Sequence, residues 1–457
     1  MVARSDQATT APLDPQPPCT DNIQDQDETG IDCGGGACQA CAVGAYTVQG
    51  TTDITLDSAS NPGWQTMPQM EVTFTLDTDS VVLTQLDWND VSAHNANEYV
   101  AVRLNVDGVP DAHGMSVWQR SSFDEDNAQN LFRIEELPAG GPYTAKVEWA
   151  AGTGQVLDLA GDSRPWWARV LSVITIPTRT GVKWAYAEGN TDACYTGART
   201  ALPNYASYTV ILGMSVDLTL DEQRVVLSQF DLDFQGPNLA WTGAQLAIDG
   251  DPGPDWTHDQ TYSSAGPEIE QLHLHRLDLK PAGTINVATR WGDGSDTVCN
   301  NTASDGHVGR RVGAIAIPSR VGATFSEIDP VTDLTHSAES GWSLFPGMSA
   351  SLDLPRNDDY VALTQVDTNG YGATNNGDWM ALTLAVDGQK SPGIHSQSSD
   401  AGEDVGIQLH RTDVLAGNQV HSFEADWGYG GGTFSMIPSR ALWTHRVGML
   451  AVPVHAE

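Results

Sequence analysis

The sequence predicts an all-β protein, with three tandem antiparallel β-sandwich domains of the jelly-roll type after a small disulfide-rich N-terminal module. Three observations support this prediction. The 457-residue chain contains 45 glycines and 24 prolines, so turns are frequent. Apolar and polar residues alternate over short stretches, as strands with one buried face require. Five sequence landmarks recur three times in the same order, at a spacing of roughly 140 residues.

Residues 1–18 are polar and proline-rich, which is typical of a tether. They show no basic start followed by an apolar core, so no export signal is recognisable. No apolar run approaches the length of a transmembrane helix, and we expect no membrane insertion. Two routes out of the cell stay open: removal of a signal that preceded Met1, or release as part of a virion.

Residues 19–44 form a segment too small to bury a core, and they contain Cys19, Cys33, Cys38 and Cys41. An even set of cysteines in such a segment favours two disulfides. The competing interpretation is a zinc site with four thiolates. That site usually has two close cysteine pairs, and only Cys38 and Cys41 have this spacing. Four cysteines allow three disulfide connectivities, and the spacing does not choose among them.

Oxygen ligands are dense between the first two cysteines. Calcium takes six to eight oxygen ligands from carboxylates, amides and carbonyls in a tight loop, and the segment supplies such groups. The candidate ligands are Asp21, Asn22, Asp25, Asp27, Glu28 and Asp32. A merely solvated acidic loop is the alternative. The spacing is not that of an EF-hand.

Residues 19–41 read C-T-D-N-I-Q-D-Q-D-E-T-G-I-D-C-G-G-G-A-C-Q-A-C. This stretch resembles a short cysteine module of secreted bacterial proteins, in which "DET", "D-C-G-G" and "C-x-x-C" are fixed points. It departs from that pattern at Asn22 and Gly30, and by one extra residue before Cys38. The resemblance implies an extracellular or surface setting and a knot held by calcium and disulfides. It implies no catalytic activity.

The remainder of the chain is a threefold repeat. The landmarks are a first strand, a second strand ending in Asp-Gly, an Arg-bearing strand, a tryptophan, and a closing strand ending in proline. The first landmark reads "VVLTQLD" (81–87), "VVLSQFD" (225–231) and "VALTQVD" (361–367). The period is too long for a solenoid, so each copy is a whole domain. The predicted boundaries are 45–178, 179–319 and 320–457. The short connections "PTRTG" and "PSRVG" predict that neighbouring domains touch.

Within each copy we expect about eight strands and almost no helix. Asp-Gly in "LNVDG", "LAIDG" and "LAVDG" predicts tight turns. A jelly roll is the first topology and an immunoglobulin-like sandwich is the second, because the Cys…Trp…Cys spacing of immunoglobulin domains is absent.

The order of these landmarks also resembles small bacterial domains related to the C1q/TNF type of jelly roll. Such domains characteristically form trimers. The resemblance therefore suggests that the three copies pack around a pseudo-threefold axis within one chain. A beads-on-a-string arrangement is the equal alternative.

Several residues inside the repeats are candidates for a special role. Cys194 and Cys299 lie near the first strand and just before the last strand of the second copy, which predicts a disulfide, with two free thiols as the alternative. His273 and His275 lie on one strand face. His275 aligns with Phe132 and His410, so a packed or hydrogen-bonded role is favoured over a metal site.

An arginine recurs in each copy, and we expect it to pair with a buried acid; a clamp for the carboxylate of a ligand is the alternative. The candidate acids are the aspartates that end the first landmark or precede the turn glycine. The arginines are Arg133, Arg276 and Arg411, and the acids are Asp87, Asp231, Asp367, Asp107, Asp249 and Asp387.

Tryptophans fall into two groups. Trp149, Trp291 and Trp427 lie in strands and are expected in the cores. Others in polar, turn-rich segments are candidates for sugar stacking or partner anchoring. They are Trp64, Trp88, Trp118, Trp241, Trp256, Trp342 and Trp379.

The net charge of −37 disfavours nucleic acid and anionic membrane surfaces as partners. No nucleophile elbow, zinc-protease motif, phosphate loop or dinucleotide fingerprint is present. We therefore expect a non-enzymatic structural or adhesion protein at the outside of a cell or virion. It would be a subunit of a surface fibre, layer or virion appendage that contacts itself, other surface proteins or glycans. A carbohydrate-binding protein is the alternative, and a secreted hydrolase is the third possibility.

Overall fold

The computed structural model describes most of the three repeats. The described residues are 41–57, 63–88, 98–119, 129–152, 156–159, 169–197, 208–236, 241–251, 256–260, 268–292, 296–300, 308–329, 334–337, 341–373, 379–397, 404–431, 433–436 and 445–456. The tether and the predicted calcium ligands of residues 19–40 lie outside them. The described part contains strands and two short 3₁₀ turns but no α-helix, which confirms the all-β prediction.

The first unit consists of two antiparallel layers of four main strands each, and its outer layer continues into the second unit through one residue pair, Trp118 with Ile269. Its inner sheet has the order β1 (Gly44–Gly50), β11 (Arg169–Pro177), β4 (Ser80–Trp88), β8 (Gln129–Leu137). Its outer sheet has the order β3 (Gln65–Leu76), β9 (Gly140–Ala151), β5 (Glu98–Val106), β7 (Met115–Gln119). Short strands complete it: β2 (Ile54–Asp57), β6 (Val109–Pro110) and β10 (Val156–Leu159).

The second unit repeats this plan. Its inner sheet is β12 (Lys183–Glu188), β21 (Arg310–Pro318), β15 (Arg224–Gly236), β18 (Glu268–Lys280). Its outer sheet is β14 (Thr209–Leu220), β19 (Gly283–Gly292), β16 (Trp241–Ile248), β17 (Trp256–Gln260). The additional pair is β13 (Ala193–Gly197) and β20 (Asp296–Asn300).

The third unit follows the same plan. Its inner sheet is β22 (Thr324–Ile328), β32 (His445–Pro453), β25 (Tyr360–Ala373), β29 (Asp404–Leu415). Its outer sheet is β24 (Trp342–Leu354), β30 (Gln419–Gly431), β26 (Trp379–Val386), β28 (Ile394–Gln397). Short strands are β23 (Leu334–Ser337), β27 (Gln389–Lys390) and β31 (Thr433–Met436).

The strand order is that of a jelly roll in every unit. Counting the eight main strands of a unit in chain order, the inner sheet runs first, eighth, third, sixth, and the outer sheet runs second, seventh, fourth, fifth. The topology expected first from the sequence is therefore the one observed. The Asp-Gly turns are also confirmed: Asp107 and Gly108 have φ values of 51° and 81°, and the corresponding residues of the other units are similar.

Sequence pattern explains which faces are buried. In β14, "TVILGMSVDLTL", buried and exposed residues alternate along the second half, so one face meets the core and the other meets solvent. In β4 and in the three closing strands β11, β21 and β32, every residue is buried. A strand buried on both faces must have a neighbour on each side. The inner sheets therefore face their own outer sheet on one side and other units on the other side.

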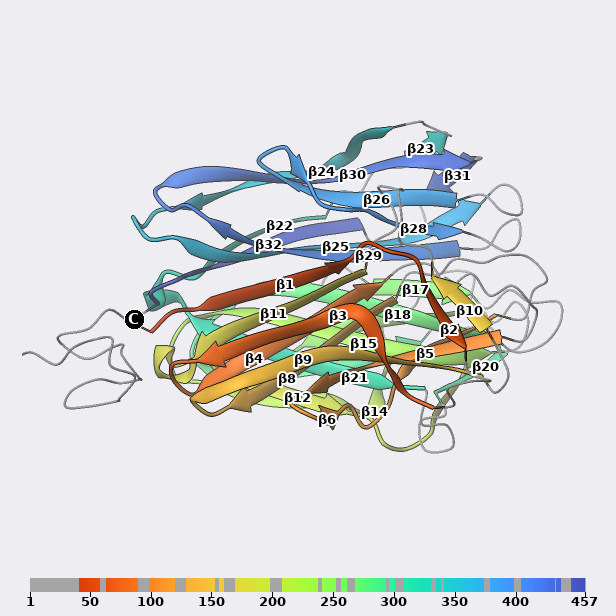
Figure 1. Cartoon of the computed structure of the whole chain (residues 1–457), viewed down its shortest axis with the longest axis horizontal. Helices are drawn as coiled ribbons and strands as arrows, with labels where there is room; N and C mark the ends of the chain where they lie inside the picture. Colours follow the sequence, from red (N-terminus) through yellow and green to blue (C-terminus); the bar gives the residue numbers. More distant parts are fainter. Residues whose placement is uncertain are drawn as a thin grey trace, which may run out of the picture.

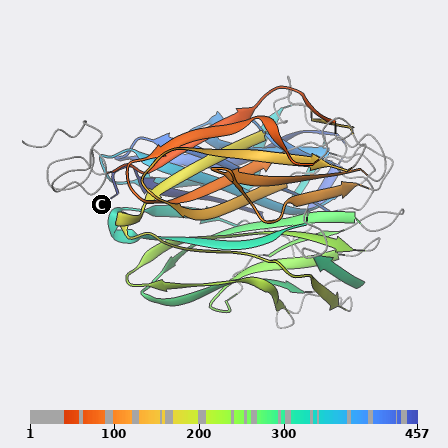
Figure 2. The same cartoon turned by 60° about the horizontal axis from the view of Figure 1, so that its bottom comes forward.

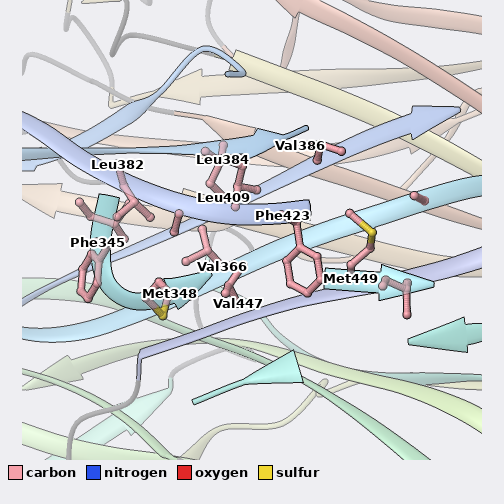
Figure 3. Packing of buried hydrophobic residues seen from close by; sticks show 14 of the residues in the cluster. Phe345, Met348, Val366, Leu382, Leu384, Val386, Leu409, Phe423, Val447 and Met449 are labelled. Atoms are coloured by element: carbon pink, nitrogen blue, oxygen red, sulfur yellow. The ribbon is translucent and has the colours of Figure 1, made fainter. Parts of the chain in front are cut away.

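Each sandwich has its own core, and a further core belongs to all three. In the third unit Phe345, Met348, Phe423 and Met449 pack between the two sheets (Figure 3). The shared core includes Leu83 of the first unit, Leu227 of the second and Leu363 of the third. The units thus form one block instead of beads on a string.

The block is arranged cyclically. The β1–β11 edge of the first unit packs on β29 of the third, the β12–β21 edge of the second on β8 of the first, and the β22–β32 edge of the third on β18 of the second. Strands of all three units run roughly along the long axis, with the third unit at the top of Figure 1. In Figure 2 the orange and yellow strands of the first unit lie above the green strands of the second.

The connections between units are short turns. The 3₁₀ turns η1 (Thr178–Thr180) and η3 (Ser319–Val321) end at Gly181 and Gly322, which have φ values of 83° and 85°. A side chain at this φ would be strained, so glycine suits both positions. Arg224 donates to the carbonyl oxygen of Gly181 at 2.5 Å and ties the first connection to β15. Neighbouring units therefore touch, as the short connections predict.

Candidate functional site

The three contacts between units are called joints here: the 1–2 joint, the 2–3 joint and the 3–1 joint. An aspartate from the first sequence landmark lies at the centre of each. Asp231 of the second unit accepts a hydrogen bond from the backbone N–H of Phe132 in the first, at 3.0 Å. Asp367 of the third unit accepts one from His275 in the second, at 2.7 Å.

The third member closes the cycle. Asp87 of the first unit accepts a hydrogen bond from the backbone N–H of His410 in the third. Asp87, Asp231 and Asp367 are all at most 3% exposed. A buried carboxylate is stabilised when it accepts such bonds, and each bond to a charged group contributes about 1.5–3 kcal/mol. The repeated aspartate thus holds one unit to the next.

A chain of glutamines lies where the three units meet. Gln85 donates to Gln229 at 3.0 Å, and Gln229 donates to Gln365 at 3.2 Å, so each unit contributes one side chain. They occupy the same place in the repeated "T/S-Q" of the first landmark. The neighbouring cavity measures only about 10 Å³. That volume admits about one water molecule and no organic substrate.

His273 is an imidazole among carboxylates. Its Nδ1 is hydrogen-bonded to Asp231, and its Nε2 lies 3.6 Å from Asp367. Burial alone lowers the pKa of His273, but Asp231, Asp367 and Asp87 outweigh it and raise the pKa to about 9. The ring is therefore an imidazolium at neutral pH, and its positive charge offsets part of the buried negative charge.

The packed role predicted for the histidine pair agrees with these contacts. Phe132, His275 and His410 are buried at one equivalent position, and the Nδ1 of His275 lies 2.6 Å from Asp367. Among the described residues, no group of three His, Cys, Asp or Glu side chains is placed to hold a metal ion.

The partners expected for the repeated arginines were wrong. Arg411 forms a two-bond ion pair with Asp413, at 2.7 and 2.8 Å, and Arg276 pairs with Asp278 at 2.7 Å. Arg133 pairs with Glu135 at 2.8 Å and also approaches Asp111 at 3.5 Å. The principal acid is two positions further along the same strand, where side chains share a face. The first-landmark aspartates are instead used at the joints.

Two arginines at the joints were not predicted as functional. Arg311 of the second unit donates to Asp111 of the first at 2.9 Å and to the carbonyl of Phe132 at 3.2 Å. Arg446 of the third unit donates to the carbonyl of His275 in the second. Their signal in the sequence was an arginine at the start of a strand that is otherwise apolar. A buried arginine needs partners, and here another unit supplies them.

The predicted disulfide between Cys194 and Cys299 is confirmed, and it joins β13 to β20. Cys41 is buried and also takes part in a disulfide. Cys19, Cys33 and Cys38 lie outside the described residues, as do Asp21, Asn22, Asp25, Asp27, Glu28 and Asp32. The calcium knot therefore stays a prediction.

The strand tryptophans are in the cores, as predicted: Trp149, Trp291 and Trp427 are each at most 5% exposed. Trp88 is completely buried, so the expectation that it lies at the surface was wrong. It ends the buried strand β4. Trp64 and Trp342 are half-buried, and the ring of Trp64 is covered by the guanidinium of Arg103, 4.4 Å from its centroid. Nothing is described for the side chains of Trp118, Trp241, Trp256 and Trp379.

Comparison with known proteins gives no family. No family model and no curated protein matches the chain. Among solved structures, N-glycanase F is matched with a TM-score of 0.26 and 10% identity, over 59% of this chain and 96% of that one. A structure of PNGF-II gives 0.23 and 9%, over 78% and 100%. Infectious bursal disease virus, Gt strain, gives 0.20 and 8%, over 92% and 84%. The described part of the chain also contains no helix long and apolar enough to cross a membrane.

Proposed function

We propose that this chain is a non-enzymatic, extracellular structural subunit that assembles with itself or with other surface proteins into a fibre, surface layer or virion appendage. Calcium bound in the cysteine module would rigidify its N-terminal end, where the tether begins. The observation that supports the proposal is that the aspartate, glutamine and tryptophan repeated in each unit hold the fold together.

Those residues are used to hold the molecule together. The aspartate and glutamine of the first landmark bond across the joints, and the tryptophans fill the cores. The buried acid and imidazole of Asp231 and His273 have the chemistry of an acid–base pair. The cavity that His273 lines has a volume of only about 10 Å³, however, and no substrate would fit in it. A rigid block suits mechanical assembly.

The disulfides support an extracellular location. The bond between Cys194 and Cys299 closes a long loop, and such bonds persist mainly in oxidising compartments. The acidic composition, with a net charge of −37, favours solubility outside the cell and leaves nucleic acid disfavoured as a partner.

Negative-stain electron microscopy and light scattering of the full chain test the proposal. We expect fibres, sheets or rings whose amount grows with protein concentration, and whose formation falls when a chelator removes calcium. Leu279 and Val414 are exposed apolar residues at equivalent positions of two units. The L279S/V414S variant is therefore a probe for the contact surface. A chain that stays monomeric at every concentration, with and without calcium, would contradict the proposal.

A further inference from the structure

The three joints lie at equivalent places in the fold, but the side chains at their equivalent positions differ. Strand register fixes which residues correspond. Asp87 lies opposite Val170, Asp231 opposite Arg311, and Asp367 opposite Arg446 in the pairs β11–β4, β21–β15 and β32–β25. The 3–1 joint therefore has Val170 where the other two joints have an arginine.

The partner of that arginine is replaced as well. Asp111 accepts from Arg311 in the 1–2 joint, and its backbone N–H bonds to the carbonyl of Leu104 after the Asp-Gly turn. The residue with the same backbone bond in the third unit is Ser391, which bonds to Leu384. Both members of the buried ion pair are thus absent from the 3–1 joint.

The first strand of each unit shows the same change. Thr47 lies opposite Ser172, while the corresponding pairs are Tyr186 with Gly313 and Glu327 with Gly448. Two positions further along, Gln49 lies opposite Val170, and Glu188 lies opposite Arg311. Thr47 is smaller than Tyr186 and Glu327, and Gln49 is uncharged where Glu188 carries a carboxylate, whereas Ser172 is slightly larger than the two glycines at its position.

These replacements leave an open cleft. It has a volume of about 290 Å³, which is near the lower end of ligand-sized sites. The first unit contributes Thr47, Gln49 and Val170 to its walls, and the third unit contributes Lys390, Ser391, Pro392, His410, Arg411, Thr412 and Asp413.

The charges in the cleft are already balanced. Lys390 is paired with Asp426, and Arg411 with Asp413. An anionic ligand would have to displace a carboxylate from its partner, and a cationic ligand would meet two cations. Neutral groups that both donate and accept hydrogen bonds fit the lining better.

Polar atoms are available for such a ligand. Two buried polar atoms of the lining have no hydrogen-bond partner among the described residues: the hydroxyl of Thr412 and the Nε2 of His410. His410 is 2% exposed, so leaving its Nε2 without a partner is unfavourable. Gln49 adds an amide, and Val170 and Pro392 offer an apolar patch. The hydroxyls of Thr47 and Ser391 already bond to protein groups, Thr47 to Ser172 and Ser391 to Thr383, but a hydroxyl can make up to three hydrogen bonds and keeps capacity for a ligand. Alternating hydroxyl groups around an apolar ring face are the chemistry of a sugar.

We propose that the cleft of the 3–1 joint binds a neutral sugar, one ring at a time, as the terminal residue of a glycan. This inference does not depend on the assembly proposed above, because sugar binding is measured on the unassembled protein.

The test uses the full chain and saturation-transfer NMR with four probes: glucose, galactose, mannose and N-acetylglucosamine. Glucuronate and acetate serve as anionic comparisons. We expect at least one neutral sugar to bind. The V170R/S391D variant introduces into the 3–1 joint the ion pair that the 1–2 joint has, and we expect it to weaken that binding at least ~10-fold, a loss of about 1.4 kcal/mol.

Two further variants make the result decisive. T47Y introduces the residue of the second unit and narrows the cleft by one side chain, so it reports on the site even where V170R/S391D fails to fold. V420R changes a valine that is 63% exposed and outside the cleft, and we expect it to bind as the unmodified chain does. Absence of binding by all four sugars, binding of the anions alone, or equal binding by the unmodified chain and T47Y would overturn the proposal.

Discussion

The carboxylate of Asp231 receives the backbone N–H of Phe132 from another unit and, on its other oxygen, the imidazole of His273 from its own unit. One side chain therefore bonds to the neighbouring unit and balances the positive charge of the buried His273. Because a backbone donor cannot rotate away, the bond sets the register between the two units.

Replacing Asp231 with alanine is expected to lower the free energy of unfolding by about 3–5 kcal/mol, the cost of removing one partner from a buried ion pair. Since the joints share one core, we expect a single calorimetric transition at a lower temperature instead of the loss of one unit. Differential scanning calorimetry checks this.

The matched control is Asp353→Ala, on the exposed face of β24, where a change within about 0.5 kcal/mol is expected. Separate melting of the units in the Asp231→Ala variant would show that the joints contribute little.

Stability should fall as the pH rises from about 6.5 to 9. The pKa of His273 is raised in the folded protein to about 9, from 6.5. A raised pKa means that the folded state binds the proton more tightly. The contribution is complete below pH 6.5, and it is lost as the pH passes the folded value, up to about 3 kcal/mol in all. Chemical denaturation across this range measures it.

Glu327 changes stability in the same direction over a different range, because burial raises its pKa to about 8. The variant His273→Gln separates the two. Glutamine is the residue at the equivalent position of the third unit, Gln408, where the strand pairing places it opposite Asp367. The pH dependence between 8 and 9 should flatten in this variant, and an unchanged slope would assign it to other groups.

The disulfide between Cys194 and Cys299 should contribute about 2–4 kcal/mol, since it closes a loop of 105 residues in the unfolded chain. The C194S/C299S variant is expected to melt at a lower temperature without loss of fold. Any further effect of a reductant on that variant then reports on the cysteines of the N-terminal module.

Calcium should raise the melting temperature or the protease resistance of the full chain if the acidic residues of the module bind it. Isothermal titration gives the affinity. D27N/D32N is expected to weaken binding, whereas D353N should leave it unchanged. Equal binding by both variants would place any calcium elsewhere.

Much of the fold followed from local patterns. Alternation in "EVTFTLDTDSVVLTQLD" and the Asp-Gly turns predicted the strands. The threefold recurrence predicted the number of sandwiches, and the missing Cys…Trp…Cys spacing favoured the jelly roll. The alternation and the turns act over a few residues, where side-chain period and turn geometry decide the structure.

The joints were beyond those patterns because they depend on which residues of distant units meet. The closing strands contain "RV" in each repeat, so a comparison of the sequences aligns Arg169 with Arg311 and Arg446. The paired strands instead place Val170 at that position and Arg169 one step earlier, opposite Trp88. A shift of one residue moves a side chain to the other face of a sheet. The cleft was thus invisible until the register was known.

The turns η1 and η3 make the three sandwiches a single polypeptide. In a ring of identical subunits, a mutation that empties one contact empties every contact and threatens the whole assembly. Here the arginine is missing from one joint only, which still has the hydrogen bond from His410 to Asp87, and the other two joints keep their arginines. Because the three units are covalently linked, the side chains of one joint can change while the other two joints keep the units together. A binding site can then arise at that joint without loss of the fold.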